Sequence, residues 1–196
     1  MEAIVQNGLR SKNTDYEVAY TLDKEKREFE RDIGWFGKYC FPTALAKDTP
    51  SFHRDIYKNL KNDDTKRVLI AAPRGTAKST VCSLIFPLYK IAYKKPNEDL
   101  FIVVVSESQA QSVNFLSRIK YHLEHSDNFK QIFGDFSSAT SKRWTGADII
   151  LKNGTRIVAV GTGQRVRGFI EGDTRPNVII VDDFESELNA FTPEGR

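Results

Sequence analysis

The stretch AAPRGTAKST, residues 71–80, contains the residue types of a phosphate-binding loop. The usual pattern is G-x-x-x-x-G-K-[ST], and it aligns here on Lys78 and Ser79. Ala72 and Ala77 then stand where the two glycines are expected, and alanine can replace glycine where φ stays negative. In such a loop the backbone N–H groups and the lysine bind phosphates, while the hydroxyl binds Mg²⁺. We therefore predict a nucleotide site, against the alternative of a surface lysine at a helix start.

The segments on either side of this loop favour the nucleotide site. The apolar run KRVLIAA, residues 66–72, predicts a strand buried on both faces. Apolar residues then recur at helical spacing from Val81 to Ala92, which predicts an amphipathic helix. Pro87 lies inside this pattern and predicts a kink or an early end near Ser83 to Phe86. A strand before the loop and a helix after it are the context that the motif requires.

A second candidate motif, VIIVDD, covers residues 178–183 and consists of four apolar residues followed by two acidic ones. An aspartate at the carboxyl end of a buried parallel strand reaches the crevice where α/β proteins bind ligands. Asp182 is accordingly predicted to bind Mg²⁺ together with Ser79. The carboxylate that orients or deprotonates the attacking water is either Asp183 or Glu185, and the sequence leaves this choice open. The alternative for this motif alone is a solvated acidic turn.

A glycine-rich, basic stretch, GTGQRVRGFIEGDTRP, precedes this last strand and contains Arg165, Arg167 and Arg175. Hydrolysis of a phosphoanhydride needs positive charge on the transition state, and an arginine finger is the usual source. The alternative is a solvated basic loop.

The remaining pattern predicts an α/β protein. A buried strand is expected within residues 99–106 and a helix within 108–126, so that strands and helices alternate as in a parallel sheet. Residues 147–161 hold two strand-like runs joined by Asn153-Gly154, which favours a two-residue hairpin turn. Near the N-terminus we expect a charged helix leading into an aromatic segment within residues 16–40.

A further helix is expected with Ser51 as its N-cap and with Phe52, Ile56 and Leu60 at helical spacing. The expected organisation is an N-terminal helical segment, residues 1–61, that packs on an ATPase core, residues 62–196.

Composition limits the other classes of protein. The 196 residues suffice for one domain, and 40% of them are hydrophobic. The longest apolar run is far shorter than a membrane span and no signal peptide is recognisable, so we expect a cytoplasmic protein without a membrane partner. The net charge of +3 permits nucleic acid as a partner without requiring it. The two cysteines, Cys40 and Cys82, are expected to be buried thiols.

The order of these motifs resembles the large terminase subunit of tailed bacteriophages. The residues that carry the resemblance run from about Phe52 to Glu185: FHRDIY, AAPRGTAKST, IVVVSESQAQ, FGDFSSATSKRWTGADIILKNGTRIVAVGTGQRVRG and RPNVIIVDDFE. The resemblance implies an ASCE-type P-loop NTPase fold with a mainly parallel central sheet flanked by helices. It also implies an ATPase motor that hydrolyses ATP with Mg²⁺ and translocates double-stranded DNA into a procapsid.

The resemblance also implies particular roles for residues. Arg74 would sense or hold the γ-phosphate, and Arg167 would be the finger that acts on a neighbouring subunit's ATP. The stretch around Phe52 and His53 is similar to the one that covers adenine, but it lacks the expected glutamine. The predicted nucleotide-binding residues are Arg74, Gly75, Thr76, Ala77, Lys78, Ser79 and Thr80.

The implied partners are double-stranded DNA, further copies in a ring, a portal protein and a small terminase subunit, in the cytoplasm of an infected bacterial host. Terminases continue into a coupling motif and a nuclease domain, so this chain is expected to be an N-terminal ATPase fragment without nuclease activity. Two alternatives remain open: a helicase or other nucleic-acid-remodelling P-loop ATPase, and a nucleotide-binding assembly module without hydrolysis.

Overall fold

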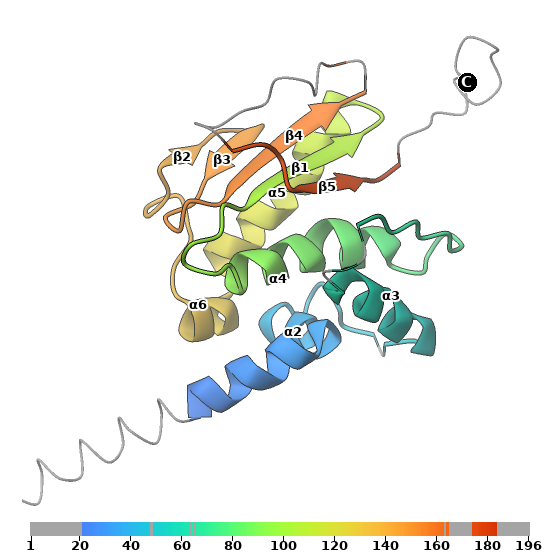
Figure 1. Ribbon diagram of the computed structural model, residues 1–196, viewed down its shortest axis with the longest axis vertical. Helices are drawn as coiled ribbons and strands as arrows, with labels where there is room; N and C mark the ends of the chain where they lie inside the picture. The colour runs from blue at the N-terminus through green and yellow to red at the C-terminus, as the bar shows by residue number, and fades with distance from the viewer. Residues whose placement is uncertain are drawn as a thin grey trace, which may run out of the picture.

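The computed structural model describes residues 21–47, 49–62, 64, 66–162, 164 and 174–183, which form helices and one mixed five-stranded sheet (Figure 1). Residues 21–31 are helical. The later helices are α2 (Ile33–Cys40), α3 (Ser51–Lys61), the π-helix η1 (Thr80–Ile85), α4 (Phe86–Ala92), α5 (Gln109–His125) and α6 (Asp127–Phe133). The strands are β1 (Phe101–Ser106), β2 (Arg143–Trp144), β3 (Asp148–Ile150), β4 (Arg156–Gly161) and β5 (Val178–Val181).

The sheet has the strand order β2-β3-β4-β1-β5. Strand β1 lies between β4 and β5 and is parallel to both, whereas β3 is antiparallel to β4 and β2 is antiparallel to β3. The α/β class is therefore confirmed. The sheet is mixed rather than mainly parallel, because the hairpin and β2 add two antiparallel pairings.

The hairpin between β3 and β4 lies where Asn153-Gly154 predicts it, but its loop is one residue longer than expected. The N–H of Gly154 donates to the carbonyl of Leu151 at 2.9 Å, and the N–H of Leu151 donates to the carbonyl of Thr155 at 2.9 Å. Gly154 has a φ of 83°. A turn closed by a left-handed glycine is the usual three-residue hairpin loop, so residues 152–154 form the connection.

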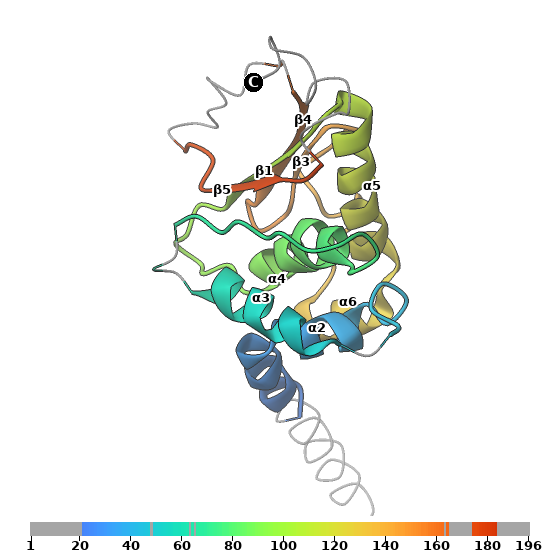
Figure 2. The same cartoon turned by 90° about the vertical axis from the view of Figure 1, so that its right-hand side faces the viewer.

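Both faces of the central strands are buried, as the continuous apolar run of β1 predicts. On one face, Ile102, Val104 and Ile157 join the main core with α4 and α5. On the other face, a second cluster contains Val103 and Val160 together with three further residues of the same strands. Helix α5 packs along β4 and β1, and Figure 2 shows it along the sheet with α4 below. This packing fixes the ends of β1 and β5 relative to the helix that follows the phosphate-loop motif.

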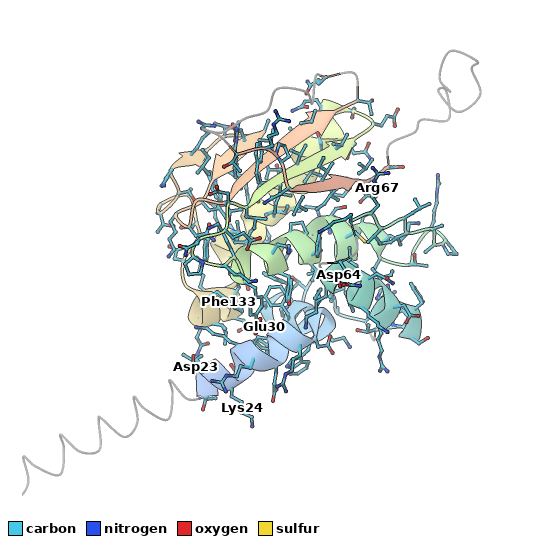
Figure 3. All side chains as sticks on the ribbon, in the orientation of Figure 1. Asp23, Lys24, Glu30, Asp64, Arg67 and Phe133 are labelled. Carbon is cyan, nitrogen blue, oxygen red and sulfur yellow. The ribbon has the colours of Figure 1, made fainter. Side chains whose placement is uncertain are left out.

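The helices before the loop are joined to the core by an aromatic cluster centred on Phe36 of α2. The Phe36 ring lies 5.5 Å from that of Tyr89 in α4 and 5.8 Å from that of Phe133 in α6, both edge to face. The hydroxyl of Tyr89 donates to the carbonyl of Glu30 at 2.8 Å (Figure 3, where Glu30 and Phe133 are labelled). Edge-to-face pairs add roughly 0.5–1.5 kcal/mol each to area burial. These contacts hold the first helices on α4 and α6.

Pro87 does not end the helix after the loop. Residues Thr80–Ile85 instead take the π form, and the N–H of Phe86 donates to the carbonyl of Val81, five residues back. Pro87 then follows the π segment inside a continuous helical run, residues 78–92, and the irregular turn before it accommodates the missing N–H of the proline. The predicted apolar stripe is buried, with Val81, Leu84 and Leu88 at most 1% exposed. A kink or an early end of the helix was expected near Ser83 to Phe86, and the structure has a π-helical segment at this place.

Three expected features differ from the structure. Residues 66–72 form no strand: Leu69 is 97% exposed, and the segment lies beside α3, where it lines a cleft with Phe52 and Ile56. A strand requires a hydrogen-bonded neighbour, and the sheet ends at β5 among the described residues. Consistently, β5 is a half-exposed edge strand, with Ile179 57% exposed.

The N-cap of α3 also differs from the expectation. The cap residue is Pro50, and the predicted cap Ser51 is the first helical residue of α3.

Candidate nucleotide site

Residues 72–79 form a tight loop in which Lys78 turns back on the backbone. Its Nζ donates to the carbonyl of Ala72 and, at 3.2 Å, to that of Pro73. The hydroxyl of Thr76 also donates to the carbonyl of Pro73, at 2.7 Å. The ammonium group is therefore held at the mouth of the loop by carbonyl oxygens.

The two glycine positions of the motif differ in backbone conformation. Ala77 has a φ of 59°, in the left-handed region, so the expectation of a negative φ at this position is wrong. Gly75 has a φ of 79° in the same loop. Ala72 is not among the described residues with positive φ. The backbone conformation thus favours glycine at residue 77 but not at residue 72. Alanine at residue 77 carries roughly 1 kcal/mol of local strain.

His53 supports this loop from α3. It is 4% exposed, and its Nε2 lies 2.7 Å from the carbonyl oxygen of Thr76, so this nitrogen carries the proton and donates. The Phe52 ring packs against the His53 ring with centroids 4.6 Å apart. The stretch expected beside adenine therefore contacts the loop of residues 72–79 through His53.

Asp182, at the carboxyl end of β5, is tied to the helix after the loop. Its Oδ2 accepts a hydrogen bond of 2.6 Å from the hydroxyl of Ser83, a residue of η1 that is fully buried. Ser79, the other predicted Mg²⁺ ligand, is one turn before Ser83, and the two are four residues apart on the same helical face. Asp182 of the second motif thus contacts η1, the helix that begins at Thr80, the last residue of the first motif.

The pKa of the Cys82 thiol depends on burial and on two charged side chains near it. Burial, and to a smaller extent the negative charge of Asp182, raise the pKa of the Cys82 thiol to about 11 against the opposing positive charge of Lys78. Both side chains therefore lie close enough to act electrostatically on one thiol. Cys82 is half-buried, whereas Cys40 is fully buried as expected, and burial raises the pKa of Cys40 to about 12.

Asp183 has a separate environment from Asp182. Its φ is 53°, its side chain is exposed, and its Oδ2 accepts a hydrogen bond of 2.9 Å from the amide of Gln111 in α5. Its carbonyl accepts a hydrogen bond of 3.0 Å from the N–H of Glu107, just after β1. The left-handed conformation turns Asp183 away from the direction of β5, and Gln111 fixes its carboxylate at the sheet edge.

The other predicted site residues are placed as follows. Arg74 is an exposed residue of the loop, and Thr80 is the first residue of η1. Arg175 is exposed and lies shortly before β5. Arg165, Arg167 and Glu185 lie outside the described residues, so the finger and one candidate carboxylate have no described position.

The donor atoms near η1 fit Mg²⁺ in kind, because this ion prefers carboxylate and hydroxyl oxygens supplemented by water. Asp182, Ser79 and Ser83 supply such oxygens. In the described part of the chain, no group of three or more histidine, cysteine or acidic side chains is arranged to hold a metal.

Three residues with a structural part in this site were not predicted from the sequence: His53 as a support for Thr76, Ser83 as the partner of Asp182, and Gln111 as the partner of Asp183. Ser83 had a usable signal, since it follows Ser79 by four residues in a predicted helix. The contacts of His53 and Gln111 span 23 and 72 residues of sequence and have no local signal.

The sequence matches no protein-family model and no curated protein sequence. In the described residues, none of the helices has both the length and the apolar character needed to cross a membrane.

Proposed function

We propose that this chain is the ATPase motor domain of a DNA-packaging terminase, in which a P-loop ATPase hydrolyses ATP with Mg²⁺ and drives double-stranded DNA. The observation that supports the proposal is the contact of Asp182 with η1, the helix that begins at the last residue of the phosphate-loop motif. Lys78 precedes this helix, Ser83 lies within it, and the Asp182 carboxylate accepts the Ser83 hydrogen bond at 2.6 Å.

The proposed chemistry follows from the properties of these groups. The Lys78 ammonium exchanges its two carbonyl partners for β- and γ-phosphate oxygens, and the Ser79 hydroxyl and Asp182 hold Mg²⁺. Mg²⁺ supplies neutralisation of the charge that develops on the phosphates. Asp183 or Glu185 orients the attacking water, and Arg167 provides the positive charge on the transferred phosphoryl group. Arg74 adds a second cation beside Lys78 at the γ-phosphate.

The terminase resemblance supplies the DNA partner, the ring of copies, the portal and small-subunit contacts and the bacterial host. A helicase with the same nucleotide chemistry would separate DNA strands, so a strand-displacement assay with ATP and Mg²⁺ distinguishes it. Unwinding of a forked duplex by the chain would favour the helicase.

A nucleotide-binding assembly module without hydrolysis is the second candidate. One observation favours it: the carboxylate of Asp183, a candidate base, is already occupied by a hydrogen bond of 2.9 Å from the amide of Gln111. Binding of ATP without turnover, with and without DNA, would support this candidate.

The test of the proposed function is the steady-state release of phosphate from ATP with Mg²⁺, in the presence of duplex DNA. We expect turnover by the wild-type chain and a loss of at least about a hundredfold in Lys78→Ala, since the mobile charge at the phosphates is removed. Lys95→Ala removes an exposed lysine from the turn after α4 and is the matched control. Equal turnover in Lys78→Ala and Lys95→Ala would refute the proposal.

A further inference from the structure

A basic cleft lies between the end of the first helix, residues 21–31, and helix α3, apart from the phosphate loop. It has a volume of about 460 Å³. Four cationic side chains line it, Arg31, Arg54, Lys58 and Lys61, together with a single carboxylate, Asp32. In Figure 1, α3 and α2 lie side by side on the part of the molecule opposite the sheet. The cleft therefore presents a strong excess of positive charge.

The single carboxylate of the cleft already has a structural role. Oδ1 of Asp32 accepts hydrogen bonds from the N–H groups of Gly34 at 2.8 Å and Trp35 at 3.1 Å, and so caps the N-terminus of α2. No carboxylate in the described part of the chain forms an ion pair with any of the four cations. The charge of the cleft is thus not neutralised by these neighbours.

The walls of the cleft are fixed by packing. The Nζ of Lys61 donates to the carbonyl of Arg31 at 3.2 Å and connects α3 to the end of the first helix. Tyr57, between Arg54 and Lys58 in α3, is 6% exposed and contacts α2 so closely that a Cβ at Gly34 would lie 2.8 Å from its ring. The four cations therefore lie on two helices, residues 21–31 and α3, whose relative position is fixed by these contacts.

The spacing of the cations favours an extended polyanion. Arg54, Lys58 and Lys61 occupy positions i, i+4 and i+7, which form one stripe along α3. The seven residue-to-residue steps from Arg54 to Lys61 rise about 10 Å along the helix. One strand of a duplex has a phosphate about every 3.4 Å along its axis, so this stripe spans about three phosphates.

From this arrangement we infer that the cleft between residues 21–31 and α3 binds the phosphate backbone of double-stranded nucleic acid. The contact is with phosphates and is independent of base sequence. All four cations are exposed and can contact phosphates, and the Lys61 ammonium is also bound to the carbonyl of Arg31. The same helix contacts the phosphate loop through His53, one residue before Arg54. The cleft itself does not depend on ATP hydrolysis, and its test uses no nucleotide.

The experiment measures the fluorescence anisotropy of a labelled 20-base-pair duplex with the full chain, without nucleotide, between 50 and 200 mM salt. Arg54→Gln/Lys58→Gln removes two charges whose side chains have no hydrogen-bond partner among the described residues, so the fold should persist. Lys95→Gln/Arg118→Gln removes two exposed charges elsewhere and is the matched control. Circular dichroism checks the fold of both variants.

We expect the slope of log K against log salt to decrease in magnitude by about 2 in the cleft variant and to stay unchanged in the control. The wild-type affinity should then fall about tenfold more than that of the cleft variant over this salt range. Competition with tripolyphosphate separates a polymeric backbone from free phosphate, and we expect weak competition. Equal slopes in the two variants, or tripolyphosphate binding as tight as the duplex, would overturn the inference.

Discussion

The hydroxyl of Ser83 donates a hydrogen bond of 2.6 Å to Oδ2 of Asp182 and so joins the helix after the loop of residues 72–79 to the carboxyl end of β5. Ser83 lies within the π-helical residues Thr80–Ile85 and is fully buried, whereas Asp182 is half-buried. π-helical segments occur frequently at functional sites. This contact connects the two halves of the candidate site.

Substitution of Ser83 by alanine should reduce the free energy of unfolding by about 2 kcal/mol, because a hydrogen bond to a carboxylate is lost in a partly buried place. Urea denaturation followed by circular dichroism measures this change. Ser79→Ala, one turn earlier, should change the free energy by less than about 0.5 kcal/mol. An equal effect of the two substitutions would show that the Ser83–Asp182 contact contributes nothing particular.

Ala77→Gly should stabilise the protein by about 1 kcal/mol, because the φ of 59° at this position strains alanine and suits glycine. The control is Ala72→Gly, at the other glycine position of the motif. It should lower stability by about 0.4–1 kcal/mol, because there glycine only adds freedom to the unfolded chain. The midpoint and slope of urea unfolding distinguish the two. Destabilisation by Ala77→Gly would mean that residue 77 is not strained.

The alkylation of Cys82 by iodoacetamide should follow a thiol pKa of about 11, raised by burial and then by Asp182, and opposed by Lys78. Asp182→Asn should therefore lower the pH midpoint of alkylation, and Lys78→Met should raise it. Peptide mapping separates Cys82 from Cys40, and Lys95→Met is the control. An unchanged midpoint in both site variants would mean that Lys78 and Asp182 do not lie near the thiol.

The same raised pKa affects stability at high pH. The folded-state pKa of Cys82, about 11, exceeds the ordinary thiol value of 9.0, so the folded state favours the protonated form. This contribution is fully present below pH 9 and is lost as the pH rises from 9 through 11. Cys82→Ser should remove part of this alkaline loss of stability in urea unfolding at pH 8 and pH 11. An identical pH dependence in the variant would contradict the assignment.

Gly161→Ala should destabilise the end of β4 by about 2–3 kcal/mol, because a Cβ there would lie 2.4 Å from the backbone nitrogen of Gln109. Gln109 is the first residue of α5, and its side chain accepts a hydrogen bond of 2.9 Å from the N–H of Gly161. Gly146→Ala, which meets nothing within 4 Å, is the control. Thermal unfolding measures both, and equal melting temperatures would contradict the close approach.

The elements that could be predicted from the sequence are those with a strong local pattern. The apolar run of β1 is buried on both faces, the stripe from Val81 to Ile91 is buried in one helix, and the Asn153-Gly154 pair marks a hairpin. In each case the pattern reflects burial or turn geometry within a few residues of the chain.

The failures involve long-range neighbours. The run at residues 66–72 has strand composition, but strand formation depends on a hydrogen-bonded partner that local sequence does not reveal. Ile179 of the edge strand β5 is apolar and yet 57% exposed, which the apolar run does not reveal. The φ of Ala77 is set by the closure of the loop and not by alanine's own preference. The pairing of Asp182 with Ser83 likewise depends on where β5 meets η1.

The most direct test of the account is a calorimetric titration of the full chain with ATP in the presence of Mg²⁺. We predict saturable binding by the wild-type chain and by Lys95→Ala, and a loss of at least about tenfold in affinity for Lys78→Ala. Without Mg²⁺, the wild-type chain should bind ATP more weakly than with Mg²⁺. Under these conditions the ATP affinities of the wild-type chain and of Asp182→Asn should be equal. Absence of ATP binding by the wild-type chain, or equal affinities of Lys78→Ala and Lys95→Ala, would contradict the account.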